Sequence, residues 1–347
     1  MAGKILSDRK VFFRINVDQG KHWGFGHFNR SSNLVEFFLK KKNFKVFLLL
    51  NDTKFTRKFF QKNTNKKLNI IYVKKKFSYD NIILNSKDIF IYDTLGKFKS
   101  NIFEKKRKIG FKIISLEDTT PTALNCDLVI NSKVFLSKKN KKSKKIFNNT
   151  KFMVLNSYLK SYKKKTNQKI KNFTILISSG GSDFKNILIK LYKIIINISF
   201  IKILIIVGPG VKTNNEIMKI RNNNKTKIIT KKTNLLKYYQ SADLVISAGG
   251  TMMFEAMALG KIVVAYINYP HQKKIINFFE KKKCLIKLLH KQNTRKVSNF
   301  LKKIIANLKK DKNYYSQIQK NSQRYINLSG LDNTLNLIES RILKNSL

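Results

Sequence analysis

The stretch WGFGHFNR, residues 23–30, places two glycines, a histidine and an arginine within eight residues. It follows the apolar run KVFFRINV (10–17) and leads into FNRSSNLVEFFLKKK (28–42), whose apolar residues recur with helical spacing. Glycine permits a tight turn and a close approach of a ligand to the backbone. We therefore predict a strand, a glycine-containing turn and a helix in this order.

The same alternation of short apolar runs and amphipathic segments continues along the chain. Further runs predict strands over 44–51, 68–73, 88–94, 111–118, 126–132, 173–181, 201–210, 226–230, 243–250 and 261–267. Strands that alternate with helices form parallel sheets covered on both faces. The sequence predicts an α/β protein with two Rossmann-like, doubly wound domains.

We place the N-terminal domain at residues 1–158 and the C-terminal domain at 171–347, with the last helices packing back on the N-terminal domain. Two lysine-rich segments, 137–151 and 160–172, bracket the predicted connection. A run of charges is also typical of a solvated surface loop, and this alternative stays open.

The composition is strongly basic, with 72 lysines and arginines and a formal net charge of +53. Such a charge is typical of proteins that bind nucleic acids or anionic membranes. Only nine of the basic residues are arginine, and no zinc-finger spacing, RNP box or helix-turn-helix pattern accompanies them. We expect no specific nucleic-acid partner, and peripheral contact with an anionic membrane stays open.

Compartment and assembly are predicted from weaker signals. Cys126 and Cys284 match no metal or redox spacing, so we expect small buried residues in a reducing compartment. The N-terminus carries no evident secretory signal. The apolar segment 194–210 is interrupted by Lys202 and ends in Gly-Pro-Gly, so we interpret it as a helix end followed by a buried strand. The expected protein is a cytoplasmic monomer.

In doubly wound sheets, ligands bind beyond the carboxyl ends of the strands. The first glycine turn contains Gly24 and Gly26, and it is followed by His27 and Arg30. A lone histidine in a turn often has only a local structural role. Because the chain has four histidines and this one lies in a strand-to-helix turn, we predict a function for His27.

Two further glycine turns lie in ISSGGSDFKN (177–186) and ISAGGTMMFEAMALG (246–260). Backbone N–H groups at such helix starts bind phosphates, and a carboxylate one turn later can accept ribose hydroxyls. The predicted nucleotide-binding residues are Gly180, Gly181, Ser182, Gly249, Gly250, Thr251 and Glu255. Ser182 or Asp183 could also cap the next helix. The dinucleotide fingerprint and the Walker loop are both absent, and we expect no metal and no cofactor.

Several segments occur together in an order that resembles a known family. They are FRINVDQGKHWGFGHFNR (13–30), YDTLG (92–96), LEDTTPTALNCDLVINS (116–132), ISSGGSDFKN (177–186) and VISAGGTMMFEAMALGKIVVAYINYPHQ (245–272). The chain resembles the UDP-sugar hydrolases of pseudaminic acid biosynthesis and their relatives in spore-coat polysaccharide synthesis. That family is similar to the peptidoglycan N-acetylglucosaminyltransferase. The resemblance implies the glycosyltransferase-B fold, in which two Rossmann-like domains face a nucleotide-sugar cleft.

The resemblance also implies roles for individual residues. His27 matches the histidine at the reacting centre and is the expected catalytic residue. The expected substrate-binding residues are Arg14, Gly24, Gly26, Arg30, Asp93, His271 and Gln272. The chain departs from the family at Leu95, where a tyrosine is usual, and at His271, where an asparagine is usual.

The sequence therefore predicts an enzyme that hydrolyses a UDP-linked deoxy or acetamido sugar at the anomeric C–O bond, in the synthesis of a surface glycan related to nonulosonic acids. One alternative is a glycosyltransferase that moves the sugar of a UDP-sugar to a sugar or lipid acceptor. A second alternative is a non-catalytic, basic scaffold or nucleic-acid-binding protein.

Overall fold

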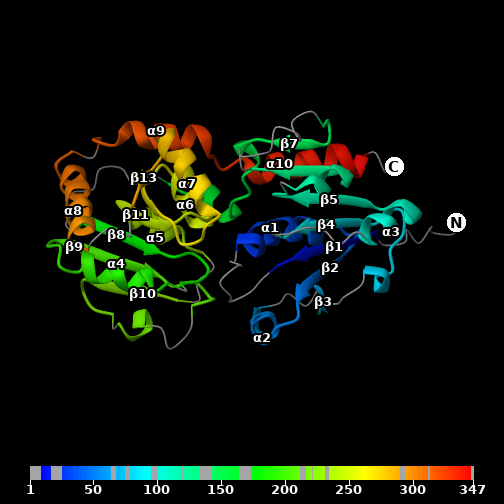
Figure 1. Ribbon diagram of the computed structural model, residues 1–347, viewed down its shortest axis with the longest axis horizontal. Helices are drawn as coiled ribbons and strands as arrows, with labels where there is room; N and C mark the ends of the chain where they lie inside the picture. Colours follow the sequence, from blue (N-terminus) through cyan, green and yellow to red (C-terminus); the bar gives the residue numbers. More distant parts are fainter. Residues whose placement is uncertain are drawn as a thin grey trace. The chain divides into compact units, whose positions relative to one another are not determined.

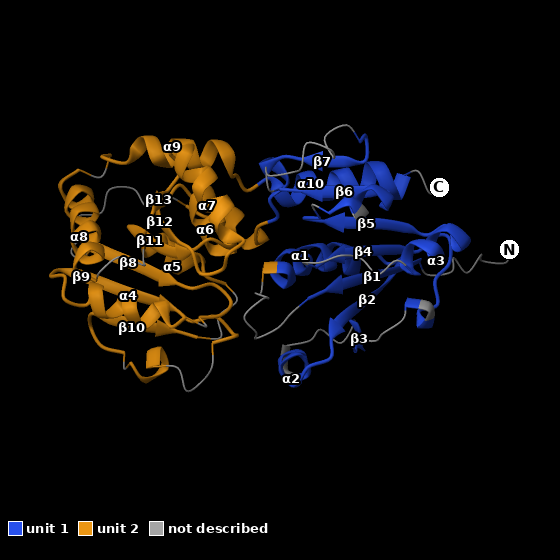
Figure 2. Cartoon of the chain, viewed as in Figure 1, with its two compact units in different colours: residues 1–18, 27–154, 329–347 blue, residues 19–26, 155–328 orange. Residues whose placement is uncertain are grey.

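The chain forms two compact units in the computed structural model (Figures 1 and 2). The first unit comprises Met1–Asp18, His27–Val154 and Ser329–Leu347, and the second comprises Gln19–Gly26 and Leu155–Leu328. The structure describes residues 9–16, 26–63, 68–74, 79–94, 101–118, 120–132, 143–163, 173–183, 185–211, 216–220, 222–230, 234–289, 294–311 and 313–344.

The first unit contains a parallel sheet of seven strands in the order β3-β2-β1-β4-β5-β6-β7. The strands are β1 (Arg9–Ile15), β2 (Phe44–Asn51), β3 (Asn69–Val73), β4 (Ile89–Asp93), β5 (Lys112–Leu116), β6 (Leu128–Asn131) and β7 (Ile146–Asn148). The strand order reverses between β1 and β4, which is the topological switch point of a doubly wound sheet.

Helices cover both faces of this sheet. They are α1 (Gly26–Lys40), α2 (Lys54–Asn63), α3 (Asn101–Ile109) and α10 (Gly330–Ile338), with short turns η1 (Tyr79–Asn81), η2 (Pro121–Asn125), η4 (Thr150–Phe152) and η7 (Glu339–Leu343). Phe38 of α1 packs edge-on against Phe13 of β1. Phe12, on the opposite face of β1, belongs to a buried cluster that includes Ile102 and Phe103 of α3.

The second unit repeats the plan with a parallel sheet of six strands in the order β10-β9-β8-β11-β12-β13. The strands are β8 (Phe173–Ser178), β9 (Ile201–Ile206), β10 (Thr226–Ile229), β11 (Leu244–Ala248), β12 (Ile262–Tyr266) and β13 (Ile286–Lys287). The helices are α4 (Ile187–Ile195), α5 (Leu236–Ser241), α6 (Thr251–Ala258), α7 (Gln272–Lys281), α8 (Thr294–Lys310) and α9 (Ser316–Tyr325), with short turns η5 (Ser157–Ser161) and η6 (Glu216–Lys219). Its switch point lies between β8 and β11.

The core of the second unit explains why its strands are continuous apolar runs. Every residue of β8, β11 and β12 is buried. Ile175 and Ile246 share one buried cluster with residues of α4 and α8, while α6 contacts β11 and β12. Strands buried on both faces lose the polar alternation of a half-exposed sheet.

The predicted fold class, two Rossmann-like α/β halves, is confirmed, and each of the strands expected from an apolar run is present within a few residues of its expected bounds. The segment 194–210 is the end of α4 followed by β9, as expected. Cys126 and Cys284 are both buried and unpaired with each other. In the part of the chain that the structure describes, no helix has the length and apolarity to cross a membrane.

Two strands were missed. β13 has only two residues, and β7 lies in the lysine- and asparagine-rich segment 137–151, one of the two segments expected to bracket the connection between domains. At residues 146–148, backbone pairing with β6 forms an edge strand in spite of the polar surroundings. Residues 137–142 lie outside the described residues.

The last helix of the chain packs on the first unit. Asn333 and Thr334 of α10 donate hydrogen bonds to the carbonyls of Lys151 and Phe152. A Cβ at Gly330 would lie 1.9 Å from the carbonyl oxygen of Met153. Only glycine therefore allows α10 to approach this backbone so closely.

We predict that Gly330→Ala destabilises the protein. Alanine stabilises an ordinary helix by about 1 kcal/mol relative to glycine, but here its methyl group collides with main-chain atoms, at a cost of about 3 kcal/mol. Thermal unfolding of this variant should begin at a lower temperature, whereas Asn336→Ala, at an exposed position of the same helix, should change little. A higher melting temperature for Gly330→Ala would contradict the close packing.

Candidate functional site

Each unit has a topological switch point, and these two positions locate the candidate functional residues of each unit. In the first unit, α1 follows β1, and β4 is the neighbour of β1 on the other side of the switch point. In the second unit, β8 and β11 are the neighbouring strands on either side of the switch point, and the loops that follow them lie there. Ligands of doubly wound sheets bind at these carboxyl ends. The predicted residues His27 and Asp93 therefore fall at one switch point, and Gly180 and Gly249 fall at the other.

His27 and Asp93 form a buried pair at the first switch point. His27 lies in the first turn of α1, and Asp93 is the last residue of β4, in register with Ile15 at the end of β1. The imidazole Nδ1 lies 2.6 Å from the carboxylate Oδ1, and Asp93 is completely buried. Because an ionised carboxylate can only accept, we assign the proton to Nδ1. Nε2 is then the atom through which the imidazole can accept a proton.

Asp93 also binds Arg30 and Ser31 of α1. Nε of Arg30 donates to Oδ2 at 3.0 Å, its Nη2 donates to Oδ1, and the hydroxyl of Ser31 donates to Oδ2 at 2.8 Å. Burial alone would raise the pKa of the Asp93 carboxyl. The charges of Arg30 and His27 outweigh burial and hold this pKa well below its ordinary value. Asp93 therefore stays ionised and fixes the orientation of both α1 side chains.

Glu117 adds a second carboxylate that the sequence analysis did not single out. It directly follows β5, and its Oε1 accepts hydrogen bonds from the backbone N–H of Ser132 at 3.0 Å and from the Ser132 hydroxyl. Nη1 of Arg30 lies 3.9 Å from the same oxygen. An acidic residue at the carboxyl end of an apolar strand, as at Asp93, is the signal that could have identified it.

Three further residues were predicted to bind the substrate near the first switch point: Arg14, Gly24 and Gly26. Arg14 donates to the carbonyls of Ile15 and Leu49 and to the side chain of Asn51, so its observed contacts tie β1 to β2. Gly26 is the first residue of α1. Gly24 lies outside the described residues.

The glycine turn after β8 interlocks with the loop after β9. Gly180 has a φ of +79°, a conformation that favours glycine. A Cβ at Gly208 would lie 2.0 Å from the carbonyl oxygen of Gly180, and Gly210 donates its N–H to Gly181 at 2.8 Å. The two glycine loops are therefore packed closely against each other, and a side chain at Gly208 would not fit. Asp183 accepts hydrogen bonds from two backbone N–H groups of α4, so it provides the helix cap that we expected from Ser182 or Asp183.

The turn after β11 uses its glycines for packing. A Cβ at Gly249 would lie 2.8 Å from Cδ1 of Ile276 in α7. Gly249 and Gly250 donate their N–H groups to the carbonyls of Tyr266 and Ala248, so these two amides are occupied within the protein. The first amides of a helix have no partner inside the helix. Donors to an anion would therefore start at Thr251, the first residue of α6.

The loop after β12 connects these turns. Oε1 of Gln272, the first residue of α7, accepts from the backbone N–H groups of Asn268 and Tyr269 at 2.9 and 3.1 Å. Tyr269 shares a hydrogen bond with the hydroxyl of Ser182, and its ring stacks on the exposed ring of His271 with centroids 5.5 Å apart. Gln272 thus shapes the loop, while His271 presents an aromatic surface. Asn268 and Tyr269 were not predicted from the sequence, because their roles depend on contacts with Ser182, more than 80 residues away in the chain.

Glu255 is 1% exposed, within α6. Its Oε1 accepts from the amide of Asn156 at 2.5 Å, and its Oε2 accepts from the hydroxyl of Tyr239 at 2.8 Å. Burial raises the pKa of Glu255 to about 7, although these two hydrogen bonds act in the opposite direction. The ribose contact expected for Glu255 stays a prediction. To bind a ribose hydroxyl, the carboxylate would have to give up its hydrogen bond to Asn156 or to Tyr239.

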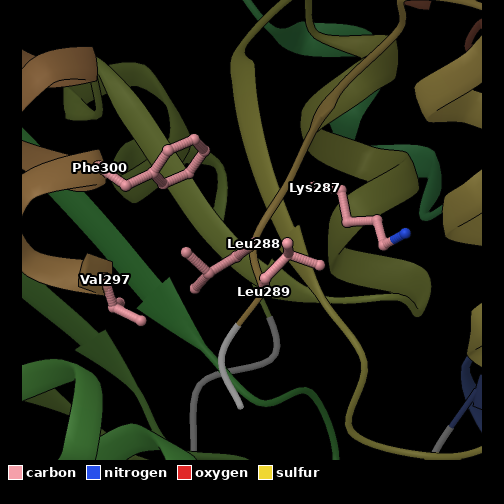
Figure 3. A pocket seen from close by; sticks show the side chains of 5 residues that line it. All are labelled: Lys287, Leu288, Leu289, Val297 and Phe300. Atoms are coloured by element: carbon pink, nitrogen blue, oxygen red, sulfur yellow. The ribbon is translucent and has the colours of Figure 1, made fainter. Parts of the chain in front are cut away.

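Two cavities lie outside the loops described above. One, of about 60 Å³, is lined by Lys287, Leu288, Leu289, Val297 and Phe300. Figure 3 shows the amino group of Lys287 pointing away from the apolar side chains. A second, shallow one of about 390 Å³ lies against α10. Ligand pockets for drug-sized molecules usually measure about 300–1,000 Å³. The first is therefore too small for a nucleotide sugar, and neither contains a predicted site residue.

The raised pKa of Glu255 predicts a pH-dependent stability. A carboxyl whose pKa rises from the ordinary 4.5 to about 7 on folding stabilises the protein fully below pH 4.5, and this contribution is lost as the pH rises through 7. Glu255→Gln should remove this dependence and stabilise the protein at pH 8 by up to about 3 kcal/mol.

Denaturant unfolding of both proteins between pH 4.5 and 8 measures this effect. The difference in free energy of unfolding should grow with pH in favour of the glutamine variant. Parallel curves for the two proteins would show that Glu255 does not titrate in this range.

Comparison with solved structures identifies the fold. The chain is similar to MurG of Acinetobacter baumannii, with a TM-score of 0.63 and 12% identity over 96% of this chain and 99% of that chain. It is also similar to S. aureus MnaA in a co-structure with UDP, with a TM-score of 0.56 and 12% identity over 98% of both chains. These similarities confirm the glycosyltransferase-B fold. The narrower resemblance to UDP-sugar hydrolases stays a prediction.

Sequence comparison gives one curated relative and one family. The chain is 27% identical over 275 residues to the uncharacterized protein MJ1062 of Methanocaldococcus jannaschii. This alignment covers 73% of the chain and 55% of the relative, so the chain spans about half of the length of MJ1062. Residues 149–328 match the glycosyltransferase family 28 C-terminal domain. Because this match covers more than half of the 347 residues, the protein belongs to this family.

Proposed function

We propose that the protein is a glycosyltransferase that moves the sugar of a UDP-sugar to an acceptor hydroxyl. Membership of glycosyltransferase family 28 supports transfer over the hydrolysis expected from the sequence. The co-structure of S. aureus MnaA with UDP, a protein of the same fold, supports UDP as the nucleotide. The observation that carries the proposal is the buried pair of His27 and Asp93 at a topological switch point.

The first unit would activate the acceptor. Nε2 of His27 would take the proton of the acceptor hydroxyl while its oxygen forms a bond to the anomeric carbon. Asp93 holds the ring through Nδ1 and stabilises the imidazolium that results, as the carboxylate does in other histidine–carboxylate pairs. The bond from the anomeric carbon to the diphosphate oxygen breaks, and UDP leaves.

The second unit would bind the nucleotide. Backbone N–H groups at the start of α6, beginning with Thr251, and the dipole of this helix would stabilise the charge on the departing diphosphate. The turn at Gly180 and Gly181 leaves space for a ligand, because a Cβ at Gly180 would meet no atom within 4 Å. The exposed ring of His271, stacked on Tyr269, would contact the sugar or the base.

Hydrolysis is the second candidate, and the spacing G-x-G-H-x-x-R at residues 24–30 favours it. Here the same imidazole would deprotonate water in place of an acceptor hydroxyl. A basic scaffold without turnover is the third candidate, and the net charge of +53 is its only support.

Incubation with UDP-glucose, UDP-N-acetylglucosamine and UDP-galactose separates these candidates. Free UDP and reducing sugar are measured separately, with and without a total lipid extract and a mixture of soluble glycans as acceptors. For transfer we expect UDP release that depends on an acceptor and yields no equivalent reducing sugar. Equal release of both products without an acceptor would indicate hydrolysis. No turnover, no thermal protection by UDP and steeply salt-dependent oligonucleotide binding would favour the scaffold.

We predict that His27→Ala lowers kcat by about two to four orders of magnitude, because it removes the base. UDP affinity, measured by calorimetry, should stay within about threefold of the wild-type value. Ser32→Ala, in the same helix, is the matched control, since the Ser32 hydroxyl donates to the Phe28 carbonyl one turn earlier and, among the described residues, contacts no candidate site residue. Full activity of His27→Ala would remove the imidazole from the mechanism.

A further inference from the structure

We propose that Glu117 is a positioning residue that fixes Arg30 and favours the protonated form of His27. This inference rests on the proposed function, in which His27 takes up a proton during the reaction. Nothing in the family match assigns a role to Glu117, because the match begins at residue 149.

The backbone at Glu117 is the first observation. Its φ is +59°, in the left-handed region that residues other than glycine rarely adopt. Such a conformation costs about 1–3 kcal/mol and persists where the surrounding structure fixes it, often at functional sites. Here the N–H of Glu117 donates to the carbonyl of Ile130, and its side chain binds Ser132. The strained backbone of Glu117 therefore carries a side-chain carboxylate that is held in one orientation.

The position of that carboxylate is the second observation. Glu117 is 8% exposed, and its Oε1 lies 3.9 Å from Nη1 of Arg30, while the same guanidinium binds both oxygens of Asp93. A buried carboxylate is costly unless cations and hydrogen-bond donors compensate it. Arg30 is thus held between two carboxylates, one at the end of β4 and one at the end of β5.

The charges of this cluster act on His27. Among the described residues, the charged groups are Asp93 of β4, which contacts the imidazole; Arg30 of the same helix; and Glu117 of the β5 end, which lies beyond Arg30. A negative charge at Glu117 favours the protonated, positively charged form of the imidazole. Burial would lower the pKa of Arg30, but Asp93 and then Glu117 raise it, so the guanidinium stays charged. Replacing Glu117 with a neutral side chain removes its negative charge, so His27 should protonate less readily.

An NMR titration of the histidine rings in the full chain tests this coupling without a substrate. The chain has four histidines, and the spectrum of His27→Ala assigns the signal of His27. In Glu117→Gln, which keeps the shape of the side chain and an acceptor for Ser132, we expect His27 to protonate at a pH about 0.5–1 unit lower than in the wild type.

Asp118→Asn is the matched control. Asp118 is the adjacent buried carboxylate, and its observed hydrogen bonds are to Ser115 and Thr120. This variant should shift the titration of His27 by less than about 0.2 unit. Equal titration of His27 in the wild type and Glu117→Gln, or equal shifts in both variants, would overturn the proposal. Glu117→Gly, whose backbone tolerates the positive φ, replaces Glu117→Gln if that variant does not fold.

Kinetics distinguish the failure of this inference from the failure of the proposed function. If the wild type turns over a UDP-sugar, Glu117→Gln should lower kcat about tenfold or more with little change in KM and should shift the acidic limb of the pH–rate profile to lower pH. An inactive wild type in which Glu117→Gln still shifts His27 would refute the proposed function alone. An active wild type without that shift would refute the role of Glu117 alone.

Discussion

The buried carboxylate of Asp93 is the interaction on which the polar end of the first sheet depends. It is completely buried and accepts hydrogen bonds from His27, Arg30 and Ser31, which all lie in the first two turns of α1. An ionised group in such a place must keep its partners, because losing one leaves a buried charge uncompensated. The end of β4 therefore fixes the rotation of α1 and, with it, the direction of the imidazole.

The two units use different chemistry at equivalent topological positions. The first presents charged side chains, with Asp93 and Glu117 at the carboxyl ends of the neighbouring strands β4 and β5 and Arg30 held by both. The second presents glycine turns and neutral hydrogen bonds, such as the bond between Ser182 and Tyr269. Charged, oriented groups suit proton transfer, whereas open backbone turns at helix starts suit phosphates. This contrast is the physical reason why we propose that the first unit activates the acceptor and the second unit binds the nucleotide.

The sequence predicted the fold well, because strands buried on both faces of a parallel sheet are visible as apolar runs. It also predicted the glycine turns that follow β8 and β11. It could not predict partners distant in the chain: His27 binds Asp93 across 66 residues, and Asn156 binds Glu255 across 99. Nor could a glycine-rich pattern show that the amides of Gly249 and Gly250 are occupied within the protein. These features depend on tertiary geometry that periodicity and spacing do not encode.

A crystal structure of the protein with UDP bound tests the central claim most directly. We expect the diphosphate to lie against the backbone N–H groups at the start of α6, near Thr251, and the glycine turn at Gly180 and Gly181. We also expect His27 to keep its bond to Asp93. UDP bound away from these turns, or a His27 side chain detached from Asp93, would contradict the account.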